Sequence, residues 1–466
     1  MELRILALVC CLVLAGCSAP TADYGETATP EPTPTAGGTP SDTGAAPSDP
    51  AEDQLGWENG FWHNESIAIN QSDGLNETEL TAFVARTMAR LELLRETEFE
   101  QTVPVEVISR EEFRGGQRRD TTVDTPRERY REQLWEGMLL VGEDRTVGAA
   151  FEELYGGAVL GYYSPGQDRI VIVSKNETPV VDRVTLAHEL VHALQDQRFS
   201  LLGGQSSHDN GLARTGVTEG DASYVEQRYE ERCAGEWECV DQPNRTSAAD
   251  IAERNLGVYL AIYAPYSEGP AFIHQVRQRG GWAAVNALYG DPPETTEQIL
   301  HPDRYPDDGP TTVRVADRSS TAWRRYDAAG ERVGEASIYA MLWYHRAVNR
   351  STFTEEDTPY SRYDYVSEAS DGWAGDRLVP YRSENGDGYV WKLRWESRAD
   401  AIEFEMAYRS ILVDGLNASR VGTNVYRVPD SSPFGDAFRV TRNGRTVTIV
   451  NAPRVRALEQ VHASGE

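Results

Sequence analysis

The chain has 466 residues, enough for two or three domains, and hydrophobic residues make up 39% of it, enough for a packed core. It has 74 acidic and 45 basic residues, and the resulting net charge of -29 excludes electrostatic binding to nucleic acid or to an anionic membrane surface. The lysines are Lys175 and Lys392 alone. Proteins that stay soluble in high salt, where the Debye length falls to about 3 Å at 1 M, have this acidic, lysine-poor composition. We therefore expect a halophilic protein, with a merely acidic secreted protein as the alternative.

Residues 1–16 have the pattern of a lipoprotein signal peptide. Their apolar run, "ILALVCCLVLAGC", is too short to span a bilayer as a helix. It ends in Leu14-Ala15-Gly16-Cys17, which resembles the lipobox of secreted lipoproteins. The resemblance implies cleavage before Cys17, a lipid on its sulfur, and a chain anchored to the cell membrane on the extracellular side. An uncleaved anchor or an ordinary signal peptide is the alternative, and in each case the rest of the chain lies outside the cytoplasm.

Residues 17–56 are rich in Pro, Thr, Gly, Ala, Ser and Asp, which predicts a disordered tether. Beyond the leader, the cysteines are Cys233 and Cys239. An isolated pair in an exported protein indicates a local disulfide. A metal site is the alternative for this pair, but no nearby histidine or second cysteine pair completes one.

Periodic apolar residues predict the elements of the first folded part. We expect helices over residues 77–96, 126–142 and 146–156, and a strand over residues 103–108. Two apolar runs flank residues 164–168, as in a β-hairpin. A helix then begins near Asp182 or Thr185, and a loop with Gly203, Gly204 and His208 leads to a second helix over residues 216–233.

The region from 250 to 306 is again helical in pattern, and the pattern changes at about residue 311. Strand-like runs lie at residues 311–317, 389–395, 423–428 and 437–450, with a helix at 397–412. Asn443-Gly444 is a strong signal for a two-residue hairpin turn. We therefore expect an α+β protein, with a mainly helical domain at residues 57–310 and a smaller C-terminal α+β domain at residues 311–466.

The helix after the hairpin contains "HELVH", residues 188–192. Residues four apart lie on one helix face, so His188 and His192 can offer two imidazole nitrogens to one ion. Glu189 lies about a third of a turn from His188 and can reach a water on that ion without being a ligand. Zinc hydrolysis needs this arrangement, because the ion acidifies the water and a carboxylate shuttles the proton. The alternative is a histidine pair that binds nothing.

A catalytic zinc usually keeps three protein ligands and one open position. Gln195 and Arg198 stand where the extended form of the motif has a glycine and a third histidine, so the third ligand must come from elsewhere. The candidates are His208, Asp196, Asp209, Glu219, Asp221 and Glu226. Glu219 is the best of them, because the small residues Gly220 and Ala222 would let its helix approach the motif helix. His208 is the competitor, since a loop histidine is a legitimate zinc ligand.

A histidine pair on one helix, followed by Glu219 in Glu-Gly-x-Ala on the next, resembles the gluzincin class of zinc metallopeptidases. The resemblance implies a zincin-like domain with one zinc per chain, held by His188, His192 and Glu219, and with Glu189 as general base. It also implies that the hairpin supplies the edge strand that pairs with an extended peptide or protein substrate.

The chain departs from the gluzincin pattern in two ways. The gap from His192 to Glu219 is longer than usual, and Ser223 stands where some members have an aspartate that orients a ligand histidine. We expect Asp221 or Asp196 to orient a ligand histidine instead.

A closer likeness is to a group of uncharacterised exported proteins that share "HELxHALQDQxF", "EGDA", "GGWAAVNALYxDPPxxTEQILHPxxY" and "GWxGDR". These motifs lie at residues 188–199, 219–222, 280–305 and 372–377. The likeness covers most of the chain beyond about residue 150 and implies no particular substrate.

Two of the shared stretches contain further candidate site residues. "ILHPDRY" offers His301 and Tyr305 as stabilisers of the transition state, and the alternative is that they cap and pack a loop. "DGWAGDR", with Asp371, Asp376 and Arg377, has the pattern of a tight turn stabilised by an Asp-Arg pair.

The sequence therefore predicts an exported, membrane-anchored zinc metallopeptidase. Two alternatives stay open: a catalytically inactive envelope lipoprotein of the same fold that binds or scaffolds, and a metal hydrolase that acts on a non-peptide bond.

Overall fold

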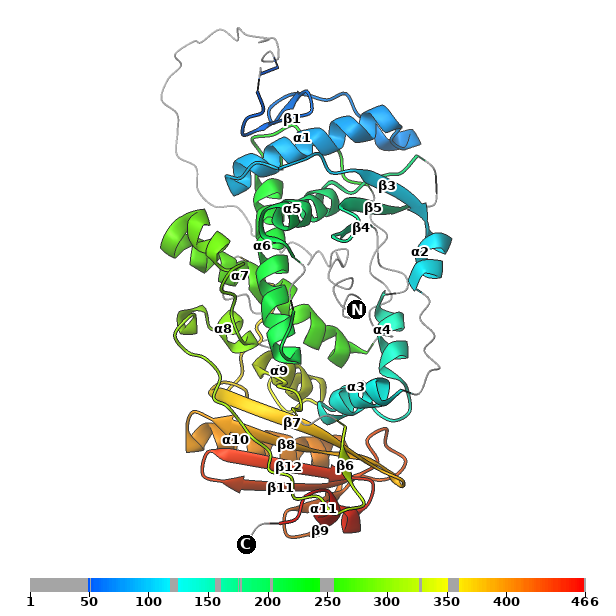
Figure 1. Ribbon diagram of the computed structural model, residues 1–466, viewed down its shortest axis with the longest axis vertical. Helices are drawn as coiled ribbons and strands as arrows, with labels where there is room; N and C mark the ends of the chain where they lie inside the picture. The colour runs from blue at the N-terminus through cyan, green and yellow to red at the C-terminus, as the bar shows by residue number, and fades with distance from the viewer. Residues whose placement is uncertain are drawn as a thin grey trace, which may run out of the picture.

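The computed structural model describes residues 49–464 except 51, 118–124, 156–160, 175, 177, 202–203, 244–254, 327–328 and 351–359. The predicted signal peptide, Cys17 and most of the predicted tether lie outside the described residues. The fold is α+β, as predicted. Helices and a small sheet occupy one end of the long axis, and a larger sheet occupies the other (Figure 1). No helix in the described ranges is long and apolar enough to cross a membrane.

The helical part begins with a two-stranded hairpin, β1 (Trp57–Glu58) and β2 (Phe61–Trp62), and with α1 (Glu77–Arg95). Asn76 caps α1 through a capping box, in which its side chain accepts from the N–H of Glu79 and the Glu79 carboxylate accepts from the N–H of Asn76. The predicted helix over 77–96 is therefore confirmed.

A three-stranded sheet lies next to these elements, in the order β3-β5-β4. Its strands are β3 (Val105–Ser109), β4 (Gly161–Ser164) and β5 (Arg169–Ser174). β5 pairs antiparallel with β4 and parallel with β3. The predicted hairpin is thus confirmed, and β4 is an edge strand.

The predicted helices are present with shifted ends. They are α3 (Pro126–Gly137), α4 (Val147–Tyr155), α5 (Arg183–Phe199), α6 (His208–Cys233), α7 (Leu256–Ala287) and α8 (Thr296–Leu300). A further helix, α2 (Arg110–Gln117), was not predicted. α3 ends before residue 142 because the buried Leu139 turns the chain with a φ of 54°. α6 begins at residue 208, where the Ser207 hydroxyl accepts from the N–H of Asn210. The prediction of a loop at His208 was wrong, because this cap starts the helix two turns earlier than the apolar pattern indicated.

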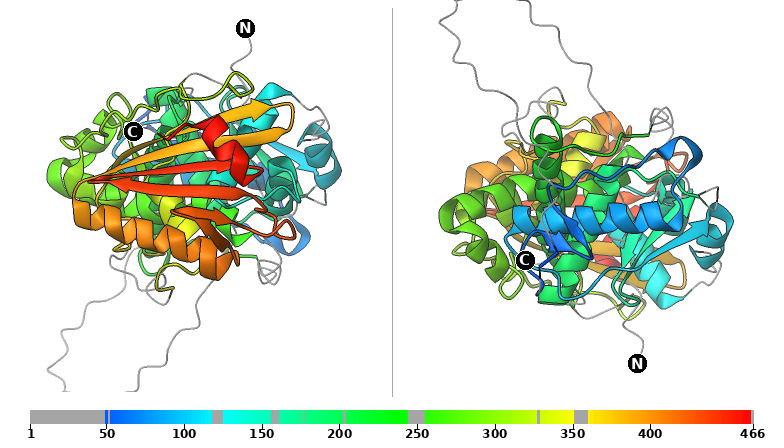
Figure 2. Two further views of the ribbon diagram at one scale, coloured as in Figure 1. Left: turned by 90° about the horizontal axis from the view of Figure 1, so that it is seen from below. Right: turned by 90° about the horizontal axis from the view of Figure 1, so that it is seen from above.

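The large sheet is antiparallel throughout, in the order β6-β7-β8-β12-β11-β10-β9, and it forms the near face in the left view of Figure 2. Its strands are β6 (Arg324–Arg325), β7 (Trp373–Ser383), β8 (Gly386–Trp395), β9 (Ser419–Gly422), β10 (Val425–Arg427), β11 (Ala437–Asn443) and β12 (Thr446–Ala452). The strand predicted at 311–317 is absent from the described chain there. Asn443 pairs with Thr446, so the hairpin turn lies at Gly444-Arg445, one residue later than predicted.

Alternation along β8 places Trp391, Leu393 and Trp395 on the sheet face that packs against the helices, and Val390 on the other face. α10 (Arg398–Ser410) and α9 (Glu335–Tyr344) cover the first face. Leu134 and Trp135 of α3 belong to the same core. The packing therefore does not divide at residues 310 and 311, because helices from before that point share a core with the sheet.

The stretch "DGWAGDR" begins in a turn at Asp371 and Gly372, but from Trp373 onward it is the start of strand β7. Buried Asp376 accepts hydrogen bonds from the N–H groups of Val333 and Gly334 and from the indole nitrogens of Trp373 and Trp391. Arg377 donates instead to the carbonyl of Gly330. The predicted Asp-Arg pair was wrong, because in a strand these neighbours point to opposite faces.

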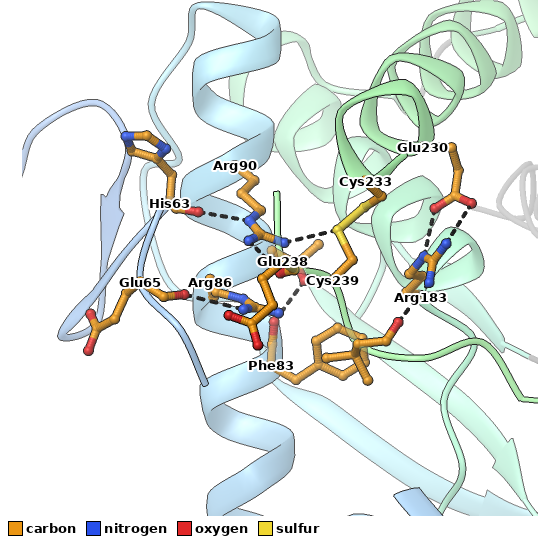
Figure 3. The surroundings of a disulfide bond; sticks show 12 residues. His63, Glu65, Phe83, Arg86, Arg90, Arg183, Glu230, Cys233, Glu238 and Cys239 are labelled. Atoms are coloured by element: carbon orange, nitrogen blue, oxygen red, sulfur yellow. Dashed lines mark hydrogen bonds and ion pairs between the residues drawn. A yellow bond between two sulfur atoms is a disulfide. The ribbon is translucent and has the colours of Figure 1, made fainter. Parts of the chain in front are cut away.

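The predicted disulfide joins Cys233, at the end of α6, to Cys239. Figure 3 shows how α1 holds this disulfide loop. Arg90 of α1 donates to Cys239 Sγ at 3.3 Å, to the carbonyl of Glu238 at 2.8 Å and to the carbonyl of His63 at 2.8 Å. One buried guanidinium thus connects α1, the N-terminal segment and the end of α6.

Candidate metal centre

The motif helix α5 is fixed at its start by Asp182. The Asp182 carboxylate accepts from the N–H groups of Val184 at 3.0 Å and Thr185 at 2.9 Å. Every residue from 184 to 195 is buried. The two histidines and Glu189 therefore lie in a dry environment between α1, the small sheet and α6, where electrostatic interactions are strong.

α6 crosses α5 and carries Glu219 (Figure 1). The next residue, Gly220, faces α7, where a Cβ on Gly220 would lie 2.5 Å from the carbonyl carbon of Gly269. We expected Gly220 to allow the approach of α5, and that expectation was wrong. Gly220 instead lets the backbones of α6 and α7 pack closely, and this contact fixes the position of Glu219.

His188, His192 and Glu219 converge on one point. His188 Nε2 and His192 Nε2 are 3.1 Å apart, and each lies 3.2 Å from Glu219 Oε2. A tetrahedral zinc with bonds of about 2.0–2.1 Å needs ligand atoms about 3.3 Å apart, so the spacing fits this ion. Three groups of side chains among the described residues could hold a metal, and this is the one in which all three members are buried.

The outer nitrogen of each histidine has its own acceptor. His188 Nδ1 lies 2.9 Å from Glu226 Oε2, and His192 Nδ1 lies 2.9 Å from Gln195 Oε1. The Gln195 amide nitrogen donates to the carbonyl of Thr218 and to Asp221, so the amide oxygen faces His192. Both Nδ1 atoms therefore face an acceptor, and both Nε2 atoms point toward Glu219.

The two aspartates expected to orient a ligand histidine contact neither ring. Asp221 accepts from Gln195, from Arg95 at 3.1 Å and from Tyr289 at 2.7 Å. It therefore orients Gln195, which in turn contacts His192. Asp196 accepts from the Tyr163 hydroxyl and from the N–H of Leu201. Glu226 and Gln195, and not the two aspartates, are the residues that contact the histidine rings.

Glu189 is held by the edge strand of the small sheet. The N–H of Tyr163 in β4 donates to Glu189 Oε2 at 2.8 Å. Glu189 Oε1 is buried and has no hydrogen-bond partner among the described residues. Burial raises the pKa of Glu189 above its ordinary value.

The pKa shifts of His188 and Glu219 indicate that the site favours a positive charge. Burial alone would lower the pKa of His188, but hydrogen bonds to Glu219 and Glu226 outweigh it and raise this pKa. Burial would raise the pKa of Glu219, but the two histidines outweigh it and keep Glu219 ionised. A buried carboxylate that pairs with two imidazoles offers a divalent cation the place that a proton otherwise takes.

The other predicted candidates have different partners. His208 Nε2 lies 3.1 Å from the Ser337 hydroxyl, and burial lowers the pKa of His208 to about 4. His301 Nε2 lies 3.2 Å from Glu335, and the Tyr305 hydroxyl donates to the carbonyl of Asp291 at 2.6 Å. In the described chain, neither His301 nor Tyr305 makes a hydrogen bond or ion pair with the His188 group.

Glu226 and Gln195 were missed as partners of the histidines, although their spacing carried a signal. Glu226 follows Glu219 by two helical turns, and Gln195 follows His192 by nearly one, so each shares a helix face with a ligand candidate.

Comparison with known proteins gives one match. Residues 324–462 match a family model described as a domain of unknown function (DUF8575). No curated protein and no solved structure matches the chain. The matched range contains the seven-stranded sheet with α9 and α10, and it lies beyond His188, His192 and Glu219 in the sequence.

Proposed function

We propose that the chain is an exported zinc metallopeptidase, tethered to the cell membrane through a lipid on Cys17. The observation that carries the proposal is the buried convergence of His188, His192 and Glu219 beside Glu189, which keeps one free carboxylate oxygen. A protein that only binds zinc needs the three ligands and has no use for a fourth, unliganded carboxylate at this place. The likeness of the motif pair to gluzincins supports the same choice.

Bound zinc would supply Lewis acidity, which lowers the pKa of a water molecule and polarises a carbonyl group. Glu189 Oε1 takes the proton from the attacking water and passes it to the leaving amine. The N–H of Tyr163 holds the other oxygen, so the carboxylate keeps its orientation while the proton moves. Glu226 and Gln195 accept from the Nδ1 atoms and so keep the two Nε2 atoms aimed inward, where they would bind zinc.

The position of β4 supports an extended peptide as the substrate. β4 is the edge of the small sheet, and an extended chain can add to such an edge through backbone hydrogen bonds. The same strand donates to Glu189, so a peptide on this edge would lie beside the general base.

The test is cleavage of a peptide library and of casein by chelator-stripped protein, with and without added zinc, in high salt. We expect new peptide termini, detected by mass spectrometry, in the zinc-loaded sample alone. Zinc bound at this site without cleavage of any peptide would instead support the alternative, a lipoprotein of the same fold that binds or scaffolds.

A further inference from the structure

The two stretches "ILHPDRY" and "DGWAGDR" meet at a point separate from the His188 group. His301 follows α8, Asp371 precedes β7, and both reach Glu335, the first residue of α9. His301 Nε2 lies 3.2 Å from Glu335 Oε1 and 3.8 Å from Asp371 Oδ1. One ligand atom from each of the three residues lies within 4.8 Å of the others.

This cluster has a buried floor and an open rim. The side chain of Glu335 is 0% exposed, that of His301 is 19% exposed and that of Asp371 is 50% exposed. Glu335 Oε2 is buried and has no hydrogen-bond partner within the described ranges. A carboxylate oxygen removed from water is costly unless a donor or a cation satisfies it, so this oxygen points to a ligand.

The neighbouring arginine does not balance the negative charge. Arg304 contacts Glu297, donates to Asp371 at 3.1 Å and to Glu396 at 2.8 Å, and makes no hydrogen bond with Glu335 among the described residues. With Glu335, four carboxylates thus surround one guanidinium and one imidazole. These carboxyl groups repel one another when ionised, and a cation at the Glu335 end of the cluster would relieve that repulsion.

We propose that His301, Glu335 and Asp371 form a second metal site that binds a divalent transition-metal ion, zinc or manganese. One imidazole with two carboxylates suits these ions, because imidazole disfavours Ca²⁺ and Mg²⁺. Water completes the coordination on the side where Asp371 is exposed. The site joins α8, α9 and the segment before β7, so the ion connects the helical part to the seven-stranded sheet. A ligand that binds only the folded state stabilises it, so the ion raises the unfolding temperature.

The test is a zinc titration of chelator-stripped full-length protein, with stoichiometry measured by elemental analysis. Wild type is expected to bind two zinc ions, and Glu335→Gln and Glu219→Ala one each. Glu396→Gln is the matched control, because Glu396 contacts Arg304 and not His301, and it is expected to bind two. Zinc should raise the unfolding temperature of Glu219→Ala, which keeps the second site, and not that of the double variant Glu219→Ala/Glu335→Gln, which lacks both sites.

The outcomes separate this proposal from the proposed function. A single zinc that Glu219→Ala loses and Glu335→Gln keeps would overturn the second site and leave the peptidase proposal intact. A single zinc that Glu335→Gln loses and Glu219→Ala keeps would support the second site and overturn the zinc site of the proposed peptidase. If Glu335→Gln does not fold, Asp371→Asn tests the site instead, because the Asp371 side chain is half-exposed. We expect Asp371→Asn to lower the affinity for the second zinc ion by about tenfold or more. Unchanged affinity in a folded Asp371→Asn would overturn the site.

Discussion

The close contact between α6 and α7 makes Gly220→Ala an informative substitution. The new Cβ would lie 2.5 Å from the carbonyl carbon of Gly269 and 2.6 Å from its oxygen. Ordinary contacts between such atoms need about 3.5–4.0 Å, so the two helices must separate by about 1 Å. Alanine gains up to ~1 kcal/mol over glycine in a helix. Overpacking costs ~1–3 kcal/mol, and here the obstructing atoms are backbone that cannot rotate away.

We therefore expect Gly220→Ala to lower the free energy of unfolding by about 1–2 kcal/mol and to weaken zinc binding, because the adjacent Glu219 moves with the helix. Urea unfolding and zinc titration measure the two effects. Gly115→Ala is the matched control, since Gly115 lies in helix α2 and a Cβ there would meet nothing within 4 Å. It should be neutral or slightly stabilising. If Gly220→Ala unfolds at the wild-type urea concentration and binds zinc as wild type does, the account of this contact is wrong.

Three further predictions concern pH, coordination and salt. Burial raises the pKa of Glu92 to about 9 and of Glu58 to about 7, above their ordinary 4.5, so the folded state holds protons that the unfolded chain has released. Stability should therefore fall as pH rises from about 5 to about 9, and Glu92→Gln should flatten this fall in urea unfolding; an equally steep fall in the variant would contradict the assignment. Gln195→Leu removes the acceptor of His192 Nδ1 and should weaken zinc binding about 10–100-fold, and wild-type affinity by calorimetry would refute the role of Gln195. At a net charge of -29, transfer from 2 M to 0.05 M NaCl should lower the melting temperature, and a constant value would exclude halophilic adaptation.

The centre of the site was predictable because its chemistry is local in sequence. His188 and His192 share one face of one helix and Glu189 lies about a third of a turn away, so helical spacing alone brings the three together. Glu219 required the choice of one carboxylate among several; the small residues Gly220 and Ala222 first favoured it, and the Glu-Gly-x-Ala resemblance supported the choice. Which carboxylate reaches the outer nitrogen of His188 depends on how α5 crosses α6, and no local pattern encodes that angle.

Burial and close approach explain two features that the sequence analysis missed or misread, α9 and the start of β7. α9 is buried from Glu335 to Trp343, so it lacks the polar face that would reveal a helical period. Gly375 indicated a turn, but it lies at a register shift in β7, where a Cβ would be 2.4 Å from the carbonyl oxygen of Thr311. A glycine required by close approach to a distant segment looks the same in sequence as a glycine required by a turn.

The most direct test of the peptidase account is the rate of peptide hydrolysis by Glu189→Gln at the same zinc content as wild type. Glutamine keeps the acceptor for the N–H of Tyr163 and leaves His188, His192 and Glu219 in place, so zinc should bind normally. Without a proton acceptor at Oε1, we predict a rate at least ~100-fold lower. A zinc-loaded Glu189→Gln protein that cleaves peptides as fast as wild type would contradict the account.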